Sequence, residues 1–377
     1  MKKFWICTLC ILFLCSLLPV SAAGPETNAK AVLLMEKTTG EVLYEEHAHD
    51  QLEPASVTKV MTMLLIMEAL DQGQITKETM VPVSAAAAGM GGSQVYMKEG
   101  ESFSVHDMLK AIAVASGNDA SVAMAEYLAG SEDAFVEKMN AKAKELGMND
   151  TIFMNCTGLP AEGHITSAYD IALMSRELIL HHPDIRTYTT IWMDTLRDGT
   201  FQLSNTNKLI RFYDGATGLK TGSTDSALYC VSATAEKEGM ELIAVVLGSP
   251  TSQDRFETAK ALLSYGFAGF SLVTAAPSEP LSPIPVTLGT QPTVQPVLTK
   301  ETKLLLPKED AGKLTTTLSL QDTIEAPVAK GQEIGTLTVL VDGKAKETIP
   351  IAAQEEVPRL SLWQVYTALL SLLFCSQ

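Results

Sequence analysis

The chain has 377 residues, of which 46% are hydrophobic and 19% are charged, which excludes a disordered chain and a small disulfide scaffold. At roughly 100–200 residues per domain, the length suits two domains or one large one. Asp and Glu number 44 against 28 Lys and Arg, a formal net charge of -16, so no nucleic-acid partner is expected.

The N-terminal segment, residues 1–23, has the pattern of a secretory signal peptide. Lys2 and Lys3 precede a mostly apolar stretch, and Ser21, Ala22 and Ala23 end it with small side chains. A transmembrane anchor is the alternative, but the apolar stretch is marginal in length for a span and no charge cluster follows it. We therefore expect an exported protein.

Between residues 30 and 272 we expect both helices and strands. Two short strands are predicted within 30–46, and a helix over 56–70 that is apolar all round from Val60 onward and therefore buried. Pro54 suits the start of that helix. The remaining elements predicted here are helices at 105–115, 119–129, 132–146, 167–180 and 253–266, and strands at 226–235 and 240–248.

The composition changes after residue 276. Six prolines fall within 277–296, which indicates a linker or an edge-strand region. Asp342-Gly343 is a hairpin signal. Short apolar runs at 303–306, 314–320, 334–341 and 347–351 predict a small all-β domain over 276–355.

The C-terminal segment, residues 357–377, is predicted to be an amphipathic helix. It has no charged side chain after Arg359, and Trp363 and Tyr366 suit a membrane–water interface. A helix lying in the interface is favoured over one that spans the bilayer or one that is buried against the preceding domain. We expect it to anchor the protein to a membrane surface.

Three of the six cysteines fall within residues 1–23, which leaves Cys156, Cys230 and Cys375. Three cysteines are not a disulfide framework, although an exported protein could form one bridge. A Cys156–Cys230 bridge stays open from the sequence alone.

The histidines give no metal signal. His47 and His49 lie in an acidic turn, and His181 and His182 end a helix. No Cys, His or carboxylate cluster has the spacing of metal ligands, so neither a metal nor a cofactor is predicted.

Ser56 and Lys59 open the buried helix as Ser-Val-Thr-Lys. Positions i and i+3 share a helix face, so the lysine amine can reach the serine hydroxyl. A buried lysine loses its charge more readily and can then act as the base that activates a serine. Free N–H groups at the helix start could stabilise an oxyanion.

Two further motifs follow at intervals of about 60 and 100 residues. Ser116-Gly117-Asn118 lies between two predicted helices, where it can be turn chemistry or can move a proton and hold a substrate amide. Lys220-Thr221-Gly222 precedes the long strands, where it can be a strand end or can bind a carboxylate and an added peptide strand.

Together the three motifs resemble the signature of penicillin-binding proteins and serine β-lactamases. The chain is further similar to low-molecular-mass D-alanyl-D-alanine carboxypeptidases at 54–62, 91–93, 116–120, 158–160 with His164, 218–222 and 262–267. The resemblance implies an α/β fold of the β-lactamase/transpeptidase type for 24–272, with an antiparallel sheet flanked by helices and a helical subdomain. A β domain and an anchor also match that family.

Carried over by position, the resemblance assigns roles to nine residues. Ser56 would be the acylated nucleophile, Lys59 its base and Ser116 a proton shuttle. The substrate-binding set would be Asn118, Lys220, Thr221, Gly222, Ser223 and Arg255, with the N–H groups of Ser56 and Ser223 as the oxyanion hole. Thr217 stands where the family commonly has Asp, which puts substrate preference in doubt.

The implied reaction removes the terminal D-Ala from peptidoglycan stem pentapeptides, with β-lactams as covalent inhibitors. The resemblance also implies a location on the outer face of the bacterial cytoplasmic membrane. A class A β-lactamase is disfavoured because Glu177 is not followed by the expected Leu-Asn pattern. A D,D-endopeptidase and a membrane-tethered sensor that acylates without turnover remain as alternatives.

Overall fold

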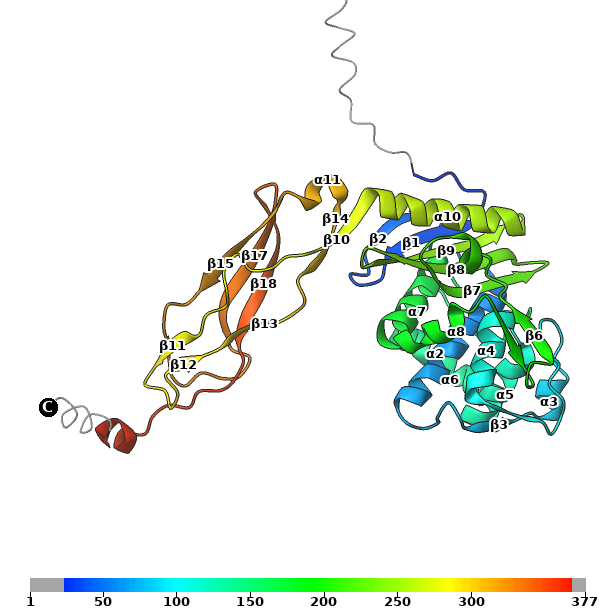
Figure 1. Ribbon diagram of the computed structural model, residues 1–377, viewed down its shortest axis with the longest axis horizontal. Helices are drawn as coiled ribbons and strands as arrows, with labels where there is room; N and C mark the ends of the chain where they lie inside the picture. The colour runs from blue at the N-terminus through cyan, green and yellow to red at the C-terminus, as the bar shows by residue number, and fades with distance from the viewer. Residues whose placement is uncertain (1–23, 368–377) are drawn as a thin grey trace, which may run out of the picture. The chain divides into compact units, whose positions relative to one another are not determined.

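The computed structural model describes residues 24–367, which form two compact units (Figure 1). The first unit comprises residues 24–34, 42–234 and 243–265. The second comprises residues 266–367 together with 35–41 and 235–242. The predicted signal peptide, residues 1–23, lies outside the described residues.

A five-stranded sheet forms the centre of residues 24–269. Short turns join three of its four strand pairs. In the fourth pair Lys30 N–H donates to Leu247 O and Lys37 N–H donates to Glu241 O, so these two strands run in opposite directions and the sheet is antiparallel. The strand order is β2-β1-β9-β8-β7, with bounds β1 (Ala31–Glu36), β2 (Val42–Glu46), β7 (Ala216–Thr224), β8 (Leu228–Lys237) and β9 (Met240–Ser249).

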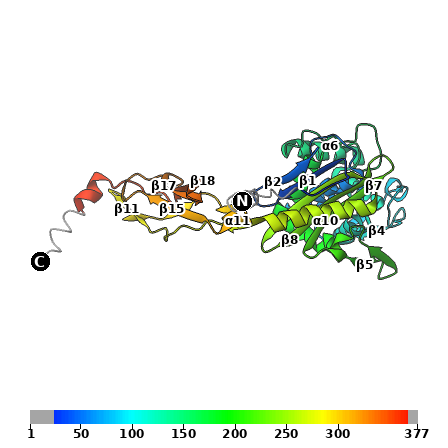
Figure 2. The same ribbon diagram turned by 90° about the horizontal axis from the view of Figure 1, so that it is seen from above.

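Helices cover both faces of this sheet. Figures 1 and 2 show α10 along one face and the helical group around α2 on the other. This explains why β9 is buried along its whole length and is an almost continuous apolar run. The helices are α2 (Lys59–Asp71), α4 (Val105–Ala115), α5 (Asn118–Ala129), α6 (Glu132–Glu145), α7 (Ala168–His181) and α10 (Ser252–Gly269).

The predicted helices are confirmed to within a few residues, with one difference that matters for the site. The α-helix expected from 56 begins at Lys59, because residues Ala55–Thr58 form the 3-10 turn η2. Ala55 has a positive φ of 47°, so the chain turns sharply just before Ser56.

Several short elements of the first unit were not expected from the sequence. They are too short for a periodic pattern to reveal them. They comprise β3 (Met80–Pro82), α3 (Ala85–Ala88), β4 (Ser102–Ser104), η3 (Pro183–Ile185), α8 (Arg186–Thr189), β5 (Met193–Leu196), β6 (Phe201–Ser204) and α9 (Leu209–Phe212).

The second unit is built mainly from strands, as expected. Its sheets are β10-β14, β12-β11-β16 and β13-β18-β17-β15, around a core that includes Ile334, Leu337 and Ile349. The bounds are β10 (Phe270–Thr274), β11 (Ile284–Thr287), β12 (Thr293–Val294), β13 (Pro296–Leu298), β14 (Lys303–Pro307), α11 (Lys308–Ala311), β15 (Leu314–Leu320), β16 (Ile324–Glu325), β17 (Glu333–Val341) and β18 (Lys344–Ala353).

Two details of this unit refine the expectations. The proline-rich stretch 277–296 contributes strands β11 and β12, so it is strand-forming rather than only a linker. Asp342-Gly343 joins β17 to β18, which confirms the predicted hairpin.

The C-terminal segment is described only as far as residue 367. Val357 pairs with Val328 and Arg359 with Gly289, so the segment starts as part of the β unit rather than as a helix at 357. Residues 362–367 are helical, and residues 368–377 of the expected anchor lie outside the described residues. Within residues 24–367, no helix combines the length and apolar character needed to cross a membrane.

Cys156 and Cys230 are both buried and free, so the structure contains no bridge between them.

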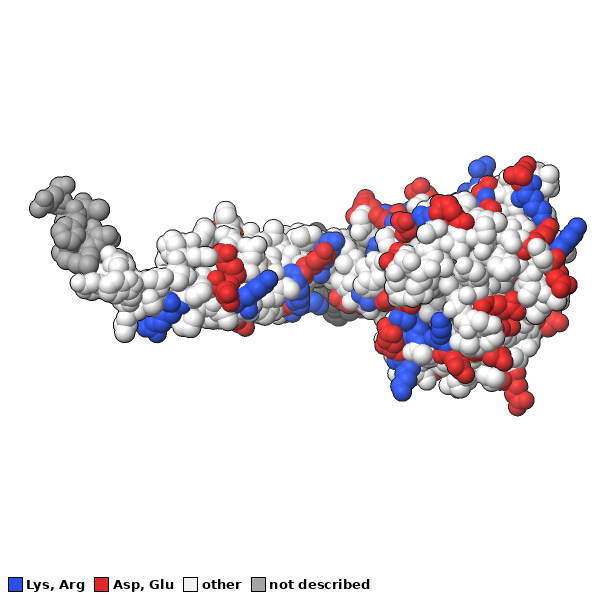
Figure 3. All heavy atoms as spheres, turned by 90° about the horizontal axis from the view of Figure 1, so that it is seen from below, with Lys and Arg blue, Asp and Glu red and all other residues white. Residues whose placement is uncertain are grey.

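On the face of the molecule drawn in Figure 3, acidic and basic side chains are interspersed rather than gathered into one charged area. On this face, binding would therefore depend on local contacts rather than on a broad charged surface.

Candidate active site

Ser56 and Lys59 meet at the start of α2. The Lys59 amine donates to Ser56 Oγ at 3.0 Å and to the Thr157 carbonyl at 2.6 Å. Ser56 itself is only partly buried, so its hydroxyl is accessible. The contact between Lys59 and Ser56 that we expected from their three-residue spacing is therefore present.

Lys59 is fully buried in the protein. Burial lowers the pKa of its amine from 10.5 to about 7, against weaker opposing effects of Cys156 and Asp119. A lysine with this pKa is partly neutral near pH 7. It can therefore accept the proton of the Ser56 hydroxyl.

Ser116 and Asn118 lie at the junction of α4 and α5, where Ser116 is the left-handed residue that ends α4 (φ 63°). Among the described residues, neither Ser116 Oγ nor Asn118 Oδ1 has a hydrogen-bond partner, although both are buried. Buried polar atoms are nearly always paired, so these two are suited to receive a ligand.

The loop 91–97 fixes Asn118 from the other side. The Asn118 amide donates to Gly91 O and its backbone N–H donates to Ser93 O, both at 2.7 Å. A side chain at Gly92 would place its Cβ 2.9 Å from Asn118 Nδ2, so only glycine fits.

Two charged residues hold this loop, and neither was assigned a role from the sequence alone. The buried Asp119 carboxylate accepts from Val95 N and Met97 N at 3.0 Å. Arg197, in the β5–β6 turn, donates to Val95 O at 3.0 Å and Tyr96 O at 2.9 Å. These partners are separated by 22 to 102 positions, so no local pattern could reveal them.

Lys220, Thr221 and Gly222 lie on β7 directly beside Ser56. A Cβ at Gly222 would be 2.8 Å from Pro54 O and 2.9 Å from Ser56 N, which explains why this position needs glycine. Thr221 Oγ1 donates to Thr206 Oγ1 at 2.7 Å.

The Lys220 amine is buried and donates to Thr221 O at 2.8 Å. Burial, with the charges of Lys59 and Arg255, holds its pKa well below 10.5. A carboxylate entering beside this amine would favour its charged form.

Arg255 and Ser223 were also expected to act on substrate. The Arg255 guanidinium donates to Gly222 O at 3.1 Å and Cys230 O at 3.2 Å, so it supports β7 and β8. Its Nε has no partner among the described residues, and burial lowers its pKa to about 10. Ser223 is exposed on β7, one residue after Gly222.

One group of possible metal ligands occurs in the described part of the chain, although none was predicted from spacing. Glu68, Glu177 and His182 bring ligand atoms within 4.8 Å of one another. Lys142 pairs with Glu68 at 2.8 Å, and Asp71 with His182 at 2.5 Å. Glu68 and His182 thus pair with neighbouring side chains, and the absence of a metal remains a prediction.

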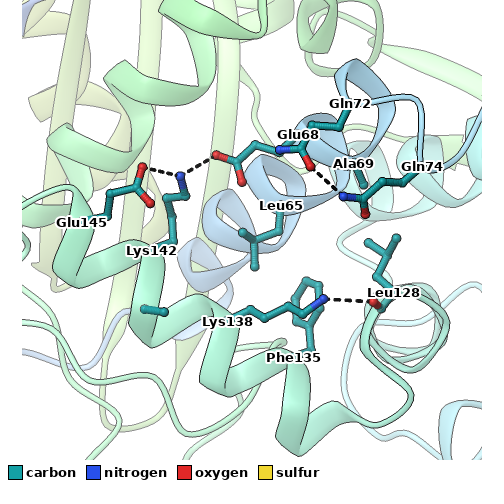
Figure 4. Close-up of a pocket in the computed structure, with 11 residues that line it drawn as sticks. Leu65, Glu68, Ala69, Gln72, Gln74, Leu128, Phe135, Lys138, Lys142 and Glu145 are labelled. Atoms are coloured by element: carbon teal, nitrogen blue, oxygen red, sulfur yellow. Dashed lines mark hydrogen bonds and ion pairs between the residues drawn. The ribbon is translucent and has the colours of Figure 1, made fainter.

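Lys142 also borders a cavity of about 350 Å³ between α2, α5 and α6. Figure 4 shows Lys142 between Glu68 and Glu145, above the apolar side chains of Leu65 and Phe135. None of the three motifs lines this cavity, so it is distinct from the Ser56 site.

Two known protein families together match almost the whole described part of the chain. Residues 19–251 match the family of D-alanyl-D-alanine carboxypeptidases. Residues 274–359 match the C-terminal domain of penicillin-binding protein 5. The boundary between the two matches falls where the composition changes.

Individual relatives give the same result. The chain is 45% identical to D-alanyl-D-alanine carboxypeptidase DacF of Bacillus subtilis, over 88% of this chain and 86% of that one. It is 34% identical to DacC of Escherichia coli, over 89% and 85%. The solved structure of penicillin-binding protein 5 from Haemophilus influenzae is 29% identical, covers 90% of this chain and 100% of its own, and superposes with a TM-score of 0.79. The chain therefore belongs to the D-alanyl-D-alanine carboxypeptidase family, with the transpeptidase-like fold and the β domain of its penicillin-binding members.

Proposed function

We propose that this protein is a serine-type D-alanyl-D-alanine carboxypeptidase that shortens peptidoglycan stem pentapeptides. The observation that carries the proposal is the Lys59 amine, buried and 3.0 Å from Ser56 Oγ. Its pKa of about 7 makes it a base near neutral pH.

In the proposed mechanism, Lys59 takes the proton of the Ser56 hydroxyl as Ser56 attacks the carbonyl of the penultimate D-Ala. The N–H groups of Ser56 and Ser223 stabilise the oxyanion. Ser116 passes a proton to the leaving amine, and terminal D-Ala departs. Water then hydrolyses the ester on Ser56 and frees the shortened peptide.

The substrate-binding roles follow from the hydrogen-bonding groups and the space that the motif residues offer to a substrate. Asn118 Oδ1 has no hydrogen-bond partner within residues 24–367 and can accept from a substrate amide. Lys220 and Thr221 are suited to the terminal carboxylate, and Gly222 lets the peptide run closely along β7. The Arg255 guanidinium stabilises β7 by donating a hydrogen bond to Gly222 O.

Inhibition by β-lactams is part of the proposal. Penicillin-binding protein D2 of Listeria monocytogenes has been solved in ampicillin-bound and cefotaxime-bound forms, and each is 32% identical to this chain. A β-lactam would acylate Ser56 in place of the D-Ala-D-Ala carbonyl.

We further propose export and attachment to the outer surface of the cytoplasmic membrane. The signal-like residues 1–23 support export. At the other end Leu362 and Trp363 are 91% and 71% exposed, which suits insertion into a membrane interface.

The test is release of D-Ala from a pentapeptide ending in D-Ala-D-Ala, with Ser56→Ala as the control. We expect release by the wild type and none above background by the variant. If folded wild-type protein releases no D-Ala but forms a stable penicillin adduct on Ser56, the sensor alternative holds. If only cross-linked peptides are cleaved, the endopeptidase alternative holds.

A further inference from the structure

A chain of hydrogen bonds lies behind the nucleophile and has no part in the proposed chemistry. Met154 N–H donates to His164 Nδ1 at 3.1 Å. Since that nitrogen accepts, the neutral imidazole carries its proton on Nε2, which lies 2.8 Å from Thr58 Oγ1. The Thr58 hydroxyl then donates to Ala55 O at 2.9 Å. Each bond in the chain therefore has one direction.

The surroundings of His164 keep this chain in place. The His164 side chain is almost completely buried, and burial lowers its pKa from 6.5 to about 4. The ring therefore stays neutral at physiological pH. Thr58 is likewise fully buried, so water does not compete for its hydroxyl.

The chain ends on the peptide group that precedes the nucleophile. The Ala55–Ser56 peptide is trans and planar, so its C=O and N–H point in opposite directions. Because Thr58 holds the Ala55 carbonyl, the Ser56 N–H is turned away from Thr58. A Cβ at Gly222 would lie 2.9 Å from Ser56 N, so the edge of β7 comes close to this nitrogen.

This peptide needs to be held. Ala55 has φ 47°, a left-handed conformation that costs free energy for a residue with a side chain. Gly158 packs against the same carbonyl so closely that a Cβ there would be 1.8 Å from Ala55 O. The geometry of the Ser56 turn is thus imposed by contacts with residues 154–164.

We propose that Thr58 and His164 are positioning residues that orient the Ser56 N–H as an oxyanion-hole donor by holding the Ala55 carbonyl. Neither residue touches substrate or takes up a proton in the reaction. The inference rests on the proposed function in one respect, namely that Ser56 is the nucleophile.

The first test compares three variants. Thr58→Val removes the hydroxyl and keeps the shape, and Thr58→Ser restores a hydroxyl. Thr62→Val is the matched control, because Thr62 is likewise a buried threonine, but it lies in α2 and donates to Cys156 O at 2.7 Å rather than to Ala55 O. We expect Thr58→Val to lower kcat for D-Ala release about ten- to hundredfold with KM little changed, as for a misdirected oxyanion donor. Thr58→Ser should recover most of that loss, and Thr62→Val should stay near wild type.

The second test separates the two sides of the imidazole. His164→Gln can place an amide N–H near the position of Nε2 and donate to Thr58 Oγ1, whereas His164→Asn can only accept from Met154 N–H. We expect His164→Gln to retain more activity than His164→Asn. Affinity for a peptidyl boronic acid, whose tetrahedral adduct places an oxygen in the oxyanion hole, should fall in parallel with kcat/KM.

Three results would overturn the inference. The first is that Thr58→Val behaves like Thr62→Val. The second is a raised KM for Thr58→Val with kcat unchanged, which would indicate a role in substrate binding. The third is a shifted midpoint of the pH profile for acylation, which would mean that Thr58 acts through Lys59. If Thr58→Val does not fold, the His164 pair decides. If wild type releases no D-Ala, the proposed function fails, but the rate of penicillin acylation still tests the positioning role.

Discussion

The contact between Ser56 and Lys59 shows how a single buried side chain sets the chemistry. An exposed lysine near pH 7 is protonated and donates, so it cannot take a proton from serine. Burial at the start of α2 changes this balance by lowering the pKa of Lys59 to about 7. The Thr157 carbonyl fixes the amine in place without supplying a negative charge that would reverse the shift.

This residue-scale argument predicts a specific pH dependence of penicillin acylation. Below pH 7 the neutral fraction of Lys59 falls about tenfold per pH unit, so the acylation rate should rise with pH and level off above about 7. The measurement is the rate of acylation by a chromogenic β-lactam between pH 5 and pH 10. A Lys59→Arg control, which cannot supply a neutral base, should stay inactive throughout, and a flat wild-type profile would contradict Lys59 as the base.

At the scale of elements, the loop 91–97 is held by residues distant in sequence. Arg197 reaches it from the β5–β6 turn through Val95 O, Tyr96 O and an ion pair with Glu101 at 3.0 Å. The guanidinium also lies over the rings of Phe103 and Phe201, at 5.1 and 5.6 Å. Since this loop carries the carbonyl partners of Asn118, its position determines the second motif.

Replacing Arg197 should therefore affect both stability and substrate binding. We expect Arg197→Ala to lower the free energy of unfolding by about 1–3 kcal/mol, because hydrogen bonds to a charged group and ring packing are lost together. The same variant should raise KM for the pentapeptide more than it lowers kcat. Arg197→Lys is the control, since it keeps the charge but not the two-pronged contact with Val95 and Tyr96. Denaturant unfolding and steady-state kinetics test this, and an unchanged KM in Arg197→Ala would contradict it.

At the scale of the whole molecule, the predicted site residues all belong to the first unit. All nine predicted site residues precede β10, and the five-stranded sheet and α10 are complete by Gly269. Penicillin-binding protein D2 of Listeria monocytogenes is covered over 100% of its length by 65% of this chain, with a TM-score of 0.60. The added β unit has its own core, which includes Ile334 and Ile351.

A chain ending at Gly269 should therefore keep its activity in solution. We expect kcat and KM for D-Ala release to stay within about twofold of the full chain, as for domains that fold around separate cores. Binding to vesicles should be lost if the C-terminal segment is the anchor. Circular dichroism confirms that the truncated chain is folded. Loss of activity in a folded truncated protein would show that the β unit contributes to the catalytic half.

The sequence by itself determined the chemistry that is encoded locally. Ser56 and Lys59 are three residues apart, and a helix start brings them together wherever it lies in the fold. Long periodic segments such as β9 and α10 were also predictable, because burial of one or both faces leaves a pattern in consecutive residues.

Only the tertiary structure decided what surrounds those residues. The lysine amine binds a carbonyl 98 positions away, and Thr58 contacts His164 across 106 positions. Gly222 lies against Ser56, and the Arg255 guanidinium holds β7 by donating to Gly222 O. Such contacts depend on how the chain packs rather than on neighbouring residues. Burial shifts the pKa of Lys59 and encloses Ser116 Oγ, which has no hydrogen-bond partner in the described part of the chain. Burial is likewise a property of the packed protein and of no short segment.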